Sequence, residues 1–263
     1  MRARLPDWMA SDYAALREDG TTAFVRNDFM ESFRRHRLEQ CALAPLLTVP
    51  PAEDARAGAG VETGGRGAVR VVPAGALGEA VVRPYRRGGM VEKFNRRTYF
   101  LGNRAFSELL ATHLLWRRGA PVPEALAAVQ SRAGLGYHGC FVTRRIPRSR
   151  PAARILATAS ASERERILES IGRAVRRFHE AGGVHPDLNA SNLLVPEEVD
   201  DPVFVIDLDR ATVLAGPVRG RRARANLRRL HRSFVKLGLE EAIADWELLE
   251  EAYAAPPDPP PAA

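Results

Sequence analysis

A polar loop set between short apolar runs, within residues 183–209, constrains this chain more than any other feature. His185, Asp187 and Asn192 follow the pattern H-x-D-x-x-x-x-N, and an apolar run begins directly after Asn192. A second apolar run, 203–206, ends in the tripeptide D-L-D. Apolar runs this short, bounded by turn-forming residues, are typical of buried strands. The sequence therefore predicts two short strands with polar side chains gathered at their ends.

The spacing matches a kinase catalytic loop, H-R-D-L-x-x-x-N, followed by the metal-binding D-F-G. In that pattern Asp187 faces the attacking hydroxyl, while Asn192 and Asp207 offer oxygen ligands to Mg²⁺ on the phosphates of ATP. An ordinary polar turn before a strand would explain either half alone, because Pro, Asp and Asn all favour turns. Both halves in the right order favour a catalytic centre.

Two further groups fit nucleotide binding. A glycine-rich turn that includes Gly65 and Gly67 lies between predicted strands, where backbone N–H groups can cover phosphates. A plain hairpin turn would have the same composition. Arg83 ends the next strand, where kinases place a phosphate-binding lysine, and Glu108 lies in the following helix where it could pair with that cation. Lys93 is the alternative phosphate contact.

The remaining chain is divided by its turn signals. We predict a strand over Thr21–Arg26, a helix from a cap at Asp28 to about Leu47, and a mobile segment over about 50–63. Ser162 and Glu165 form a capping box for a helix over 162–181, which Gly182 and Gly183 end. From Ala225 a further helix is predicted with Leu227, Leu230, Phe234 and Leu237 inward.

Composition limits the class of protein. The 263 residues can bury a full core, and the net charge of +7 comes almost entirely from arginine. Cys41 and Cys140 lie in no metal-ligand pattern, which suits a reducing cytosol. The N-terminus lacks the apolar run of a signal peptide, and no segment has the length of a membrane span. We therefore expect a cytoplasmic protein whose membrane contact, if any, is peripheral.

Residues 210–239 contain no acidic residue and carry nine arginines and lysines. A solvated basic face is the plain interpretation. The more specific one is a docking surface for an anionic substrate or membrane. Nucleic acid is disfavoured, because few aromatic residues are interleaved with the arginines for base stacking.

The motif order resembles bacterial lipopolysaccharide kinases, in particular the 3-deoxy-D-manno-octulosonic acid (Kdo) kinase branch. The resembling segments are V-V-R-P-Y-R-R-G-G-M-V (81–91), R-A-F-S-E-L-L (104–110), G-A-P-V-P (119–123), H-P-D-L-N-A-S-N-L-L-V (185–195), V-I-D-L-D-R-A (205–211) and N-L-R-R-L-H-R-S (226–233). The resemblance implies phosphorylation of a Kdo hydroxyl on a lipid A precursor, with ATP and Mg²⁺, at the cytoplasmic face of the inner membrane.

Carried onto this chain, the resemblance makes Asp187 the catalytic carboxylate and Asn192 and Asp207 the metal ligands. Arg83 would contact phosphate and Glu108 would pair with it. Arg86, Arg87 and His185 are the candidate substrate contacts, and they face an anionic, lipid-linked sugar.

The predicted fold is α+β, a two-lobed protein-kinase-like architecture. A β-rich N-terminal lobe spans 1–147, a mainly helical catalytic lobe spans 148–255, and a disordered tail spans 256–263. Two other functions stay open on sequence grounds. A phosphotransferase for a small alcohol or aminoglycoside shares the loop spacing, and a non-catalytic kinase-like module could bind a membrane or a partner.

Overall fold

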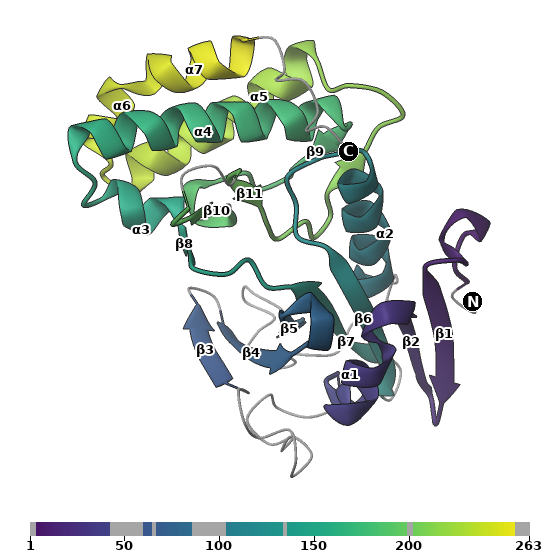
Figure 1. Ribbon diagram of the computed structural model, residues 1–263. Coiled ribbons are helices and arrows are strands. Elements are labelled where there is room, and N and C mark those ends of the chain that lie inside the picture. The colour runs from purple at the N-terminus through teal and green to yellow at the C-terminus, as the bar shows by residue number, and fades with distance from the viewer. Residues whose placement is uncertain are drawn as a thin grey trace. The chain divides into compact units, whose positions relative to one another are not determined.

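The computed structural model describes residues 4–42, 60–64, 67–85, 104–133, 136–198 and 202–255. The chain forms two compact units, one made of Met1–Leu110 with Glu124–Arg145 and the other of Ala111–Pro123 with Ile146–Ala263. The first unit is built on an antiparallel sheet and the second is mainly helical (Figure 1). This confirms the predicted α+β class.

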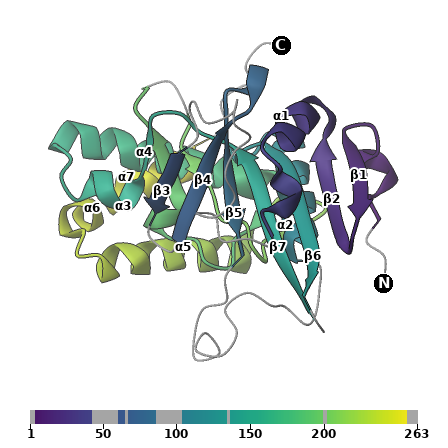
Figure 2. The same ribbon diagram turned by 90° about the horizontal axis from the view of Figure 1, so that it is seen from below.

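Seven antiparallel strands form the sheet of the first unit, in the order β1-β2-β6-β7-β5-β4-β3 (Figure 2). The strands are β1 (Tyr13–Glu18), β2 (Thr21–Arg26), β3 (Gly60–Gly64), β4 (Gly67–Pro73), β5 (Glu79–Pro84), β6 (Ala125–Ala133) and β7 (Gly136–Arg144). Single turns of 3₁₀ helix lie at Asp7–Met9, Asn27–Phe29, Leu38–Gln40 and Gly75–Leu77. Strand β2 has the bounds that the sequence predicted.

The glycine-rich turn closes a hairpin. Gly64 of β3 is paired with Gly67 of β4, so the turn itself, with Gly65, lies outside the described residues. Residues 60–63, at the end of the segment predicted to be mobile, pair with β4 in β3.

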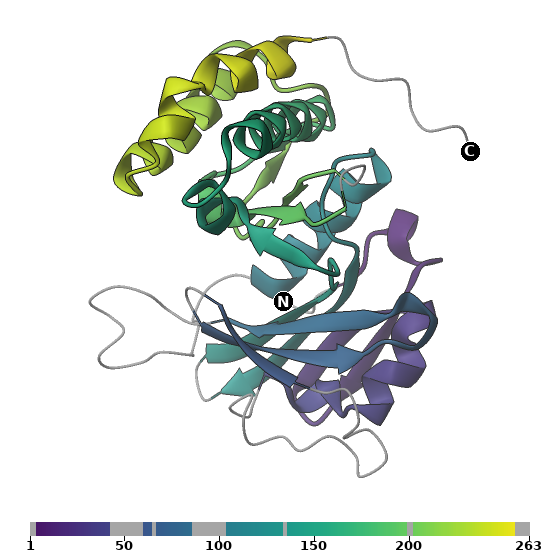
Figure 3. The same ribbon diagram turned by 60° about the vertical axis from the view of Figure 1, so that its left-hand side comes forward.

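Alternation along the strands gives the sheet two apolar faces. Phe29 and Phe33, before and within α1 (Met30–Arg35), pack in a cluster with Val25 of β2, whereas Phe24 of the same strand packs in a cluster with Phe106 of α2 (Arg104–Arg117). Figure 3 shows α1 and α2 on opposite sides of the sheet. Helix α2 is divided between the two units after Leu110.

The predicted helix from Asp28 to Leu47 is wrong in length and in its cap. Helix α1 ends at Arg35, and no side chain caps its start. Asp28 instead accepts hydrogen bonds from the Arg26 guanidinium at 2.7 and 2.9 Å, an ion pair that engages both of its oxygens. A charge-assisted pair of this kind competes directly with a capping bond.

The second unit packs its helices around three short strand pairings. Its helices are α3 (Ala152–Leu156), α4 (Ala161–Glu180), α5 (Gly220–Lys236), α6 (Glu240–Ala244) and α7 (Trp246–Ala254), and its strands are β8 (Ser149–Pro151), β9 (Gly183–Val184), β10 (Leu193–Pro196), β11 (Phe204–Val205) and β12 (Thr212–Val213). Strands β11, β10 and β8 form one small sheet, and β12 pairs with β9.

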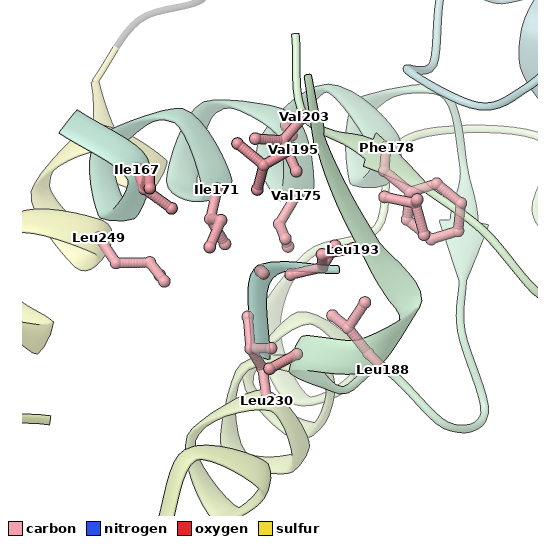
Figure 4. Close-up of a cluster of buried hydrophobic side chains, with 14 of the residues drawn as sticks. Ile167, Ile171, Val175, Phe178, Leu188, Leu193, Val195, Val203, Leu230 and Leu249 are labelled. Carbon is pink, nitrogen blue, oxygen red and sulfur yellow. The ribbon is translucent and has the colours of Figure 1, made fainter. Parts of the chain in front are cut away.

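Helix α4 supplies the centre of the second core. Ile167, Ile171, Val175 and Phe178 recur at helical spacing on one face and point at the small strands (Figure 4). The helix begins one residue earlier than predicted, because Ser160 rather than Ser162 is its cap and accepts from the Glu163 N–H at 3.4 Å. The sequence contains two overlapping S-x-x-E patterns, and only the backbone geometry distinguishes them.

Helix α5 begins at Gly220, five residues before the predicted start at Ala225. Leu230 and Phe234 are fully buried as predicted, but Leu237 follows the last helical turn and is 49% exposed. The inward stripe is completed instead by Ala223 and Asn226. In the part of the chain that the structure describes, no helix is long and apolar enough to cross a membrane.

Close packing of α4 on α7 depends on Gly172. A Cβ added there would overlap the Leu249 carbonyl oxygen and lie 2.9 Å from Ala252 Cβ. Gly172→Ala is therefore expected to lower the free energy of unfolding by about 1–3 kcal/mol, the usual cost of overpacking a core. Urea unfolding measures this loss. Gly216→Ala is the control, because a Cβ there meets nothing within 4 Å, and equal stability of both variants would contradict the prediction.

Candidate active site

The two strands predicted around the polar loop are adjacent. Leu193 of β10 pairs with Val205 of β11, and Leu194 pairs with Phe204. Antiparallel pairing brings the start of β10 beside the end of β11, and the Ile206 N–H donates to the Asn192 carbonyl at 3.0 Å. The loop that carries Asp187 and the segment that carries Asp207 therefore lie together in the helical unit.

His185 fixes the shape of this loop. Its side chain is buried, its Nδ1 accepts from the Asp187 N–H at 3.0 Å, and its Nε2–H donates to the Ile206 carbonyl at 3.1 Å. Both ring nitrogens are thus engaged by backbone on the two segments of the site. In this arrangement both nitrogens of His185, predicted as a substrate contact, bind backbone and position the loop. Burial lowers the pKa of His185, which keeps it in the neutral form that these two bonds need.

Asp187 is held by its backbone while its side chain is exposed. Its carbonyl accepts from the side-chain amides of Asn189 at 3.0 Å and of Asn192 at 2.9 Å. Since Asn192 uses its amide nitrogen here, its Oδ1 is the atom with which it could bind a cation. Asn189 also caps a turn of 3₁₀ helix, Ala190–Asn192, by accepting from the Ser191 N–H at 2.9 Å.

Asp207 has a backbone φ of +60°, in the left-handed region that non-glycine residues rarely occupy. Aspartate is among the side chains that tolerate this region best. Strained residues of this kind cluster at active sites, where the surrounding structure holds them. The contacts that hold Asp207 are made by the preceding residue, Ile206. Its N–H donates to the Asn192 carbonyl, and its carbonyl accepts from His185.

Two polar residues on the inward face of α5 hydrogen-bond to the backbone of the loop that carries Asp187. Asn226 is completely buried, accepts from the His185 N–H at 3.2 Å and donates to the His185 carbonyl at 2.6 Å. Ser233, two turns further along, accepts from the Ala190 N–H at 3.0 Å. Neither role was predicted from the sequence. The available signal was two polar side chains seven residues apart on the same helical stripe as Leu230.

His179 of α4 continues this network. Its Nε2–H donates to Asn226 Oδ1 at 3.1 Å, and its Nδ1 accepts from the Tyr253 hydroxyl of α7 at 2.9 Å. Burial lowers the pKa of His179 to about 4, although the bond to Asn226 opposes that shift. In the unfolded chain the His179 imidazole is protonated near pH 6.5, so the folded state binds this proton more weakly than the unfolded state does.

The His179 contribution to stability is therefore complete above pH 6.5 and is lost as the pH falls from 6.5 to about 4. A pKa lowered from 6.5 to about 4 corresponds to roughly 3 kcal/mol over that window. Urea unfolding at several pH values measures the loss. His179→Gln cannot titrate and is expected to be less stable at neutral pH but to show a shallower decline over the same window. Parallel pH profiles for the two proteins would contradict this prediction.

The sheet unit carries the second predicted group of residues. Arg83 of β5 forms the predicted ion pair with Glu108 of α2 at 2.5 Å, with the Glu108 side chain 1% exposed. The Tyr85 hydroxyl donates to the other carboxylate oxygen, and the guanidinium groups of Arg83 and Arg104 each lie 5.3 Å from the Tyr85 ring centre. Burial raises the pKa of Tyr85, and the Glu108 charge adds to this, so the phenol remains a donor.

Some predicted site residues cannot be placed. Gly65, Arg86, Arg87 and Lys93 lie outside the described residues. Gly67 is the first residue of β4, opposite Gly64. Within the described ranges, no three His, Cys, Asp or Glu side chains are grouped so that they could hold a metal ion.

Comparison with known proteins points to one family. The sequence model of the lipopolysaccharide kinase (Kdo/WaaP) family matches residues 54–253. The 3-deoxy-D-manno-octulosonic acid kinase of Xanthomonas oryzae pv. oryzae (strain PXO99A) is 38% identical over 229 residues, which is 84% of this chain and 88% of that protein. The enzyme of the same name from Xanthomonas campestris pv. campestris (strain B100) is 38% identical over 201 residues, 73% of this chain and 78% of that protein.

A solved structure described as WaaP in complex with acyl carrier protein covers 75% of this chain and 78% of its own, with 20% identity and a TM-score of 0.48. The assignment rests on the sequence matches, which span both the Arg83–Glu108 pair and the loop of Asp187. The chain therefore belongs to the lipopolysaccharide kinase (Kdo/WaaP) family, as its motif order predicted.

Proposed function

We propose that this protein is a Kdo kinase, which transfers the terminal phosphoryl group of ATP to a hydroxyl of Kdo on a lipid A-linked precursor of lipopolysaccharide. The observation that carries the proposal is the rigidly held loop of Asp187 in a chain that is 38% identical to enzymes named for this activity. Kinase sites act mainly by positioning and by electrostatic stabilisation, so a loop fixed through its backbone suits the task.

Asp187 is the proposed general base. Its exposed carboxylate would accept the proton of the attacking Kdo hydroxyl and orient the oxygen toward the phosphoryl group. The backbone bonds of Asp187 to His185, Asn189 and Asn192 support this role, because they restrict the loop without using the carboxylate.

Asn192 and Asp207 are the proposed ligands of Mg²⁺. An amide oxygen and a carboxylate are hard donors of the kind this ion prefers, and Mg²⁺ commonly takes only one or two protein ligands besides phosphate and water. The orientation of Asn192 supports the assignment, since its nitrogen is occupied by the Asp187 carbonyl. When bound, the ion would neutralise charge on the ATP phosphates.

Arg83 is the proposed contact to those phosphates, and Glu108 its positioning partner. The pair is short, and its acid is buried, which supports a fixed guanidinium orientation. Gly65 and Gly67 are proposed to cover the phosphates through the backbone of the hairpin turn. Arg86 and Arg87, from the Y-R-R-G-G segment, remain the proposed contacts to the acidic sugar.

We place the reaction at the cytoplasmic face of the inner membrane, where ATP meets a lipid-linked acceptor, with the protein attached peripherally. The test is transfer of labelled phosphate from Mg-ATP to a Kdo-bearing lipid A precursor. Label on Kdo is the expected result. Turnover only with small soluble alcohols would favour the alternative phosphotransferase, and nucleotide binding without any transfer would favour a non-catalytic module.

Glu108→Gln is expected to raise KM for ATP by on the order of ten-fold, about 1.4 kcal/mol, with a smaller effect on kcat. The amide keeps the volume but removes the charge that orients Arg83. Steady-state kinetics at varied ATP concentration measure the change. Tyr85→Phe is the matched control, because it removes one hydrogen bond to Glu108 and leaves the ion pair. An unchanged KM in Glu108→Gln would remove Arg83 from the proposed phosphate site.

A further inference from the structure

Helix α5 presents a face made almost entirely of arginine. The residues on the side opposite to buried Leu230 follow helical spacing and are all exposed: Arg221, Arg224, Arg228, Arg232 and Val235. We call this set the arginine face. It covers the full length of a helix whose other side holds the catalytic loop through Asn226 and Ser233.

The charges of the arginine face are not neutralised by neighbours. None of its four arginines forms an ion pair with another residue in the described part of the chain. On α4, by contrast, Arg164 pairs with Glu241 and Asp245, and Arg173 pairs with Glu169. An arginine-rich composition therefore does not by itself explain unpaired arginines, since the protein pairs several of them elsewhere.

Apolar surface lies at both ends of α5. At the C-terminal end, Val235 of the arginine face is 57% exposed, and Leu237, on the side of Leu230, is 49% exposed. At the N-terminal end, a half-open cavity of about 400 Å³ is lined by Ala223 and Leu227 of α5, by Tyr253 of α7 and by the flanking Arg219 and Arg224. A purely ionic partner would leave this apolar surface in water.

We propose that α5 docks on an anionic lipid surface, with the arginine face against the headgroups and Val235, which belongs to that face, against the outer hydrocarbon. Basic residues near an acidic lipid surface each contribute about 1 kcal/mol, and an exposed apolar side chain on the same face adds a contact that salt does not screen. An acidic protein or a nucleic acid would satisfy the arginines only. The inference deepens the proposed function by naming the surface that brings the enzyme to a lipid-linked acceptor.

Vesicle flotation tests the docking without any kinase assay. The full-length protein is mixed with vesicles of phosphatidylcholine alone or of phosphatidylcholine with phosphatidylglycerol. We expect binding to the anionic vesicles only, weakened by salt. Replacing all four arginines of the face by glutamine should weaken binding by about five-fold per residue. Val235→Ser should weaken it by a factor that persists at high salt.

The control removes the same charge from another surface. Arg154, Arg166, Arg173 and Arg177 are exposed residues of α3 and α4, and their joint change to glutamine should leave vesicle binding within about two-fold of wild type. Equal losses of vesicle binding in the two quadruple variants would overturn the proposal, because net charge alone would then explain the binding. So would equal binding of the wild type to neutral and anionic vesicles.

Competition identifies the class of partner. If a short DNA duplex displaced the protein from vesicles and Val235→Ser had no effect on vesicle binding, a polyanion surface would replace the lipid surface and the proposal would be wrong. Phosphate transfer to a detergent-dispersed acceptor reports on the proposed function separately. We expect the arginine-face variant to keep this activity and to lose vesicle binding. A wild-type protein that binds vesicles but transfers no phosphate would contradict the kinase assignment and leave the docking proposal intact.

Discussion

Asp187→Asn is expected to lower kcat for phosphoryl transfer by about 10²–10⁴-fold while the protein stays folded. The amide cannot accept the proton of the attacking hydroxyl, although its shape is nearly the same. The hydrogen bonds from Asp187 to His185, Asn189 and Asn192 are made by its backbone N–H and carbonyl, so they persist in the variant. Labelled-phosphate transfer measures the rate, and thermal unfolding reports on the fold.

Glu197→Gln is the matched control for this experiment. It makes the same carboxylate-to-amide change at an exposed position just after β10, outside the loop. We expect its kcat to stay close to that of the wild type. Full activity in Asp187→Asn would exclude the residue as the general base, and an equal loss in both variants would show that the assay reports a general charge effect.

Asn226→Leu is expected to lower the free energy of unfolding by on the order of 3–5 kcal/mol. The substitution removes three hydrogen bonds at a fully buried position and leaves the His185 N–H and carbonyl and the His179 Nε2–H without this partner. Leucine is close in volume, so the loss reports on polar satisfaction more than on packing. Urea unfolding measures it.

The same variant is expected to lose phosphoryl transfer even under conditions where it is folded. Asn226 holds His185, and His185 in turn accepts from the Asp187 N–H and donates to the Ile206 carbonyl. Arg228→Leu is the control on the same helix, and its exposed position should change stability by no more than about 0.5 kcal/mol. A folded Asn226→Leu protein with wild-type kcat would show that α5 does not position the catalytic loop.

Local sequence patterns were sufficient wherever neighbouring residues carried the signal. The strand over Thr21–Arg26 and the stripe from Ile167 to Phe178 depend on short-range periodicity, and the structure confirms both. The cap at Asp28 failed for a different reason. Its carboxylate was taken by Arg26, which also pairs with Glu124, almost a hundred residues away along the chain. Arg26 is only two residues from Asp28, but the contact with Glu124 that also holds its guanidinium is absent from any local pattern.

The residues of the candidate site show the same division between features that local patterns predict and features that depend on the fold. The order H-x-D-x-x-x-x-N and D-L-D predicts site roles for Asp187, Asn192 and Asp207, because the chemistry of phosphoryl transfer restricts which side chains can stand at those spacings. His185 belongs to the same motif, and the structure shows its two nitrogens bonded to backbone. Whether a histidine contacts substrate or backbone depends on what surrounds its two nitrogens, and both partners here come from the folded loop.

The sequence by itself determined the family, the α+β class and the polar residues of the catalytic loop, since motifs and periodicity are properties of residues close together in the chain. Only the tertiary structure decided which groups hold that loop. His179, Asn226 and Tyr253 come from three helices and meet through hydrogen bonds in a buried space. Buried polar groups must find partners wherever the fold brings them, and that choice is made by packing between distant segments.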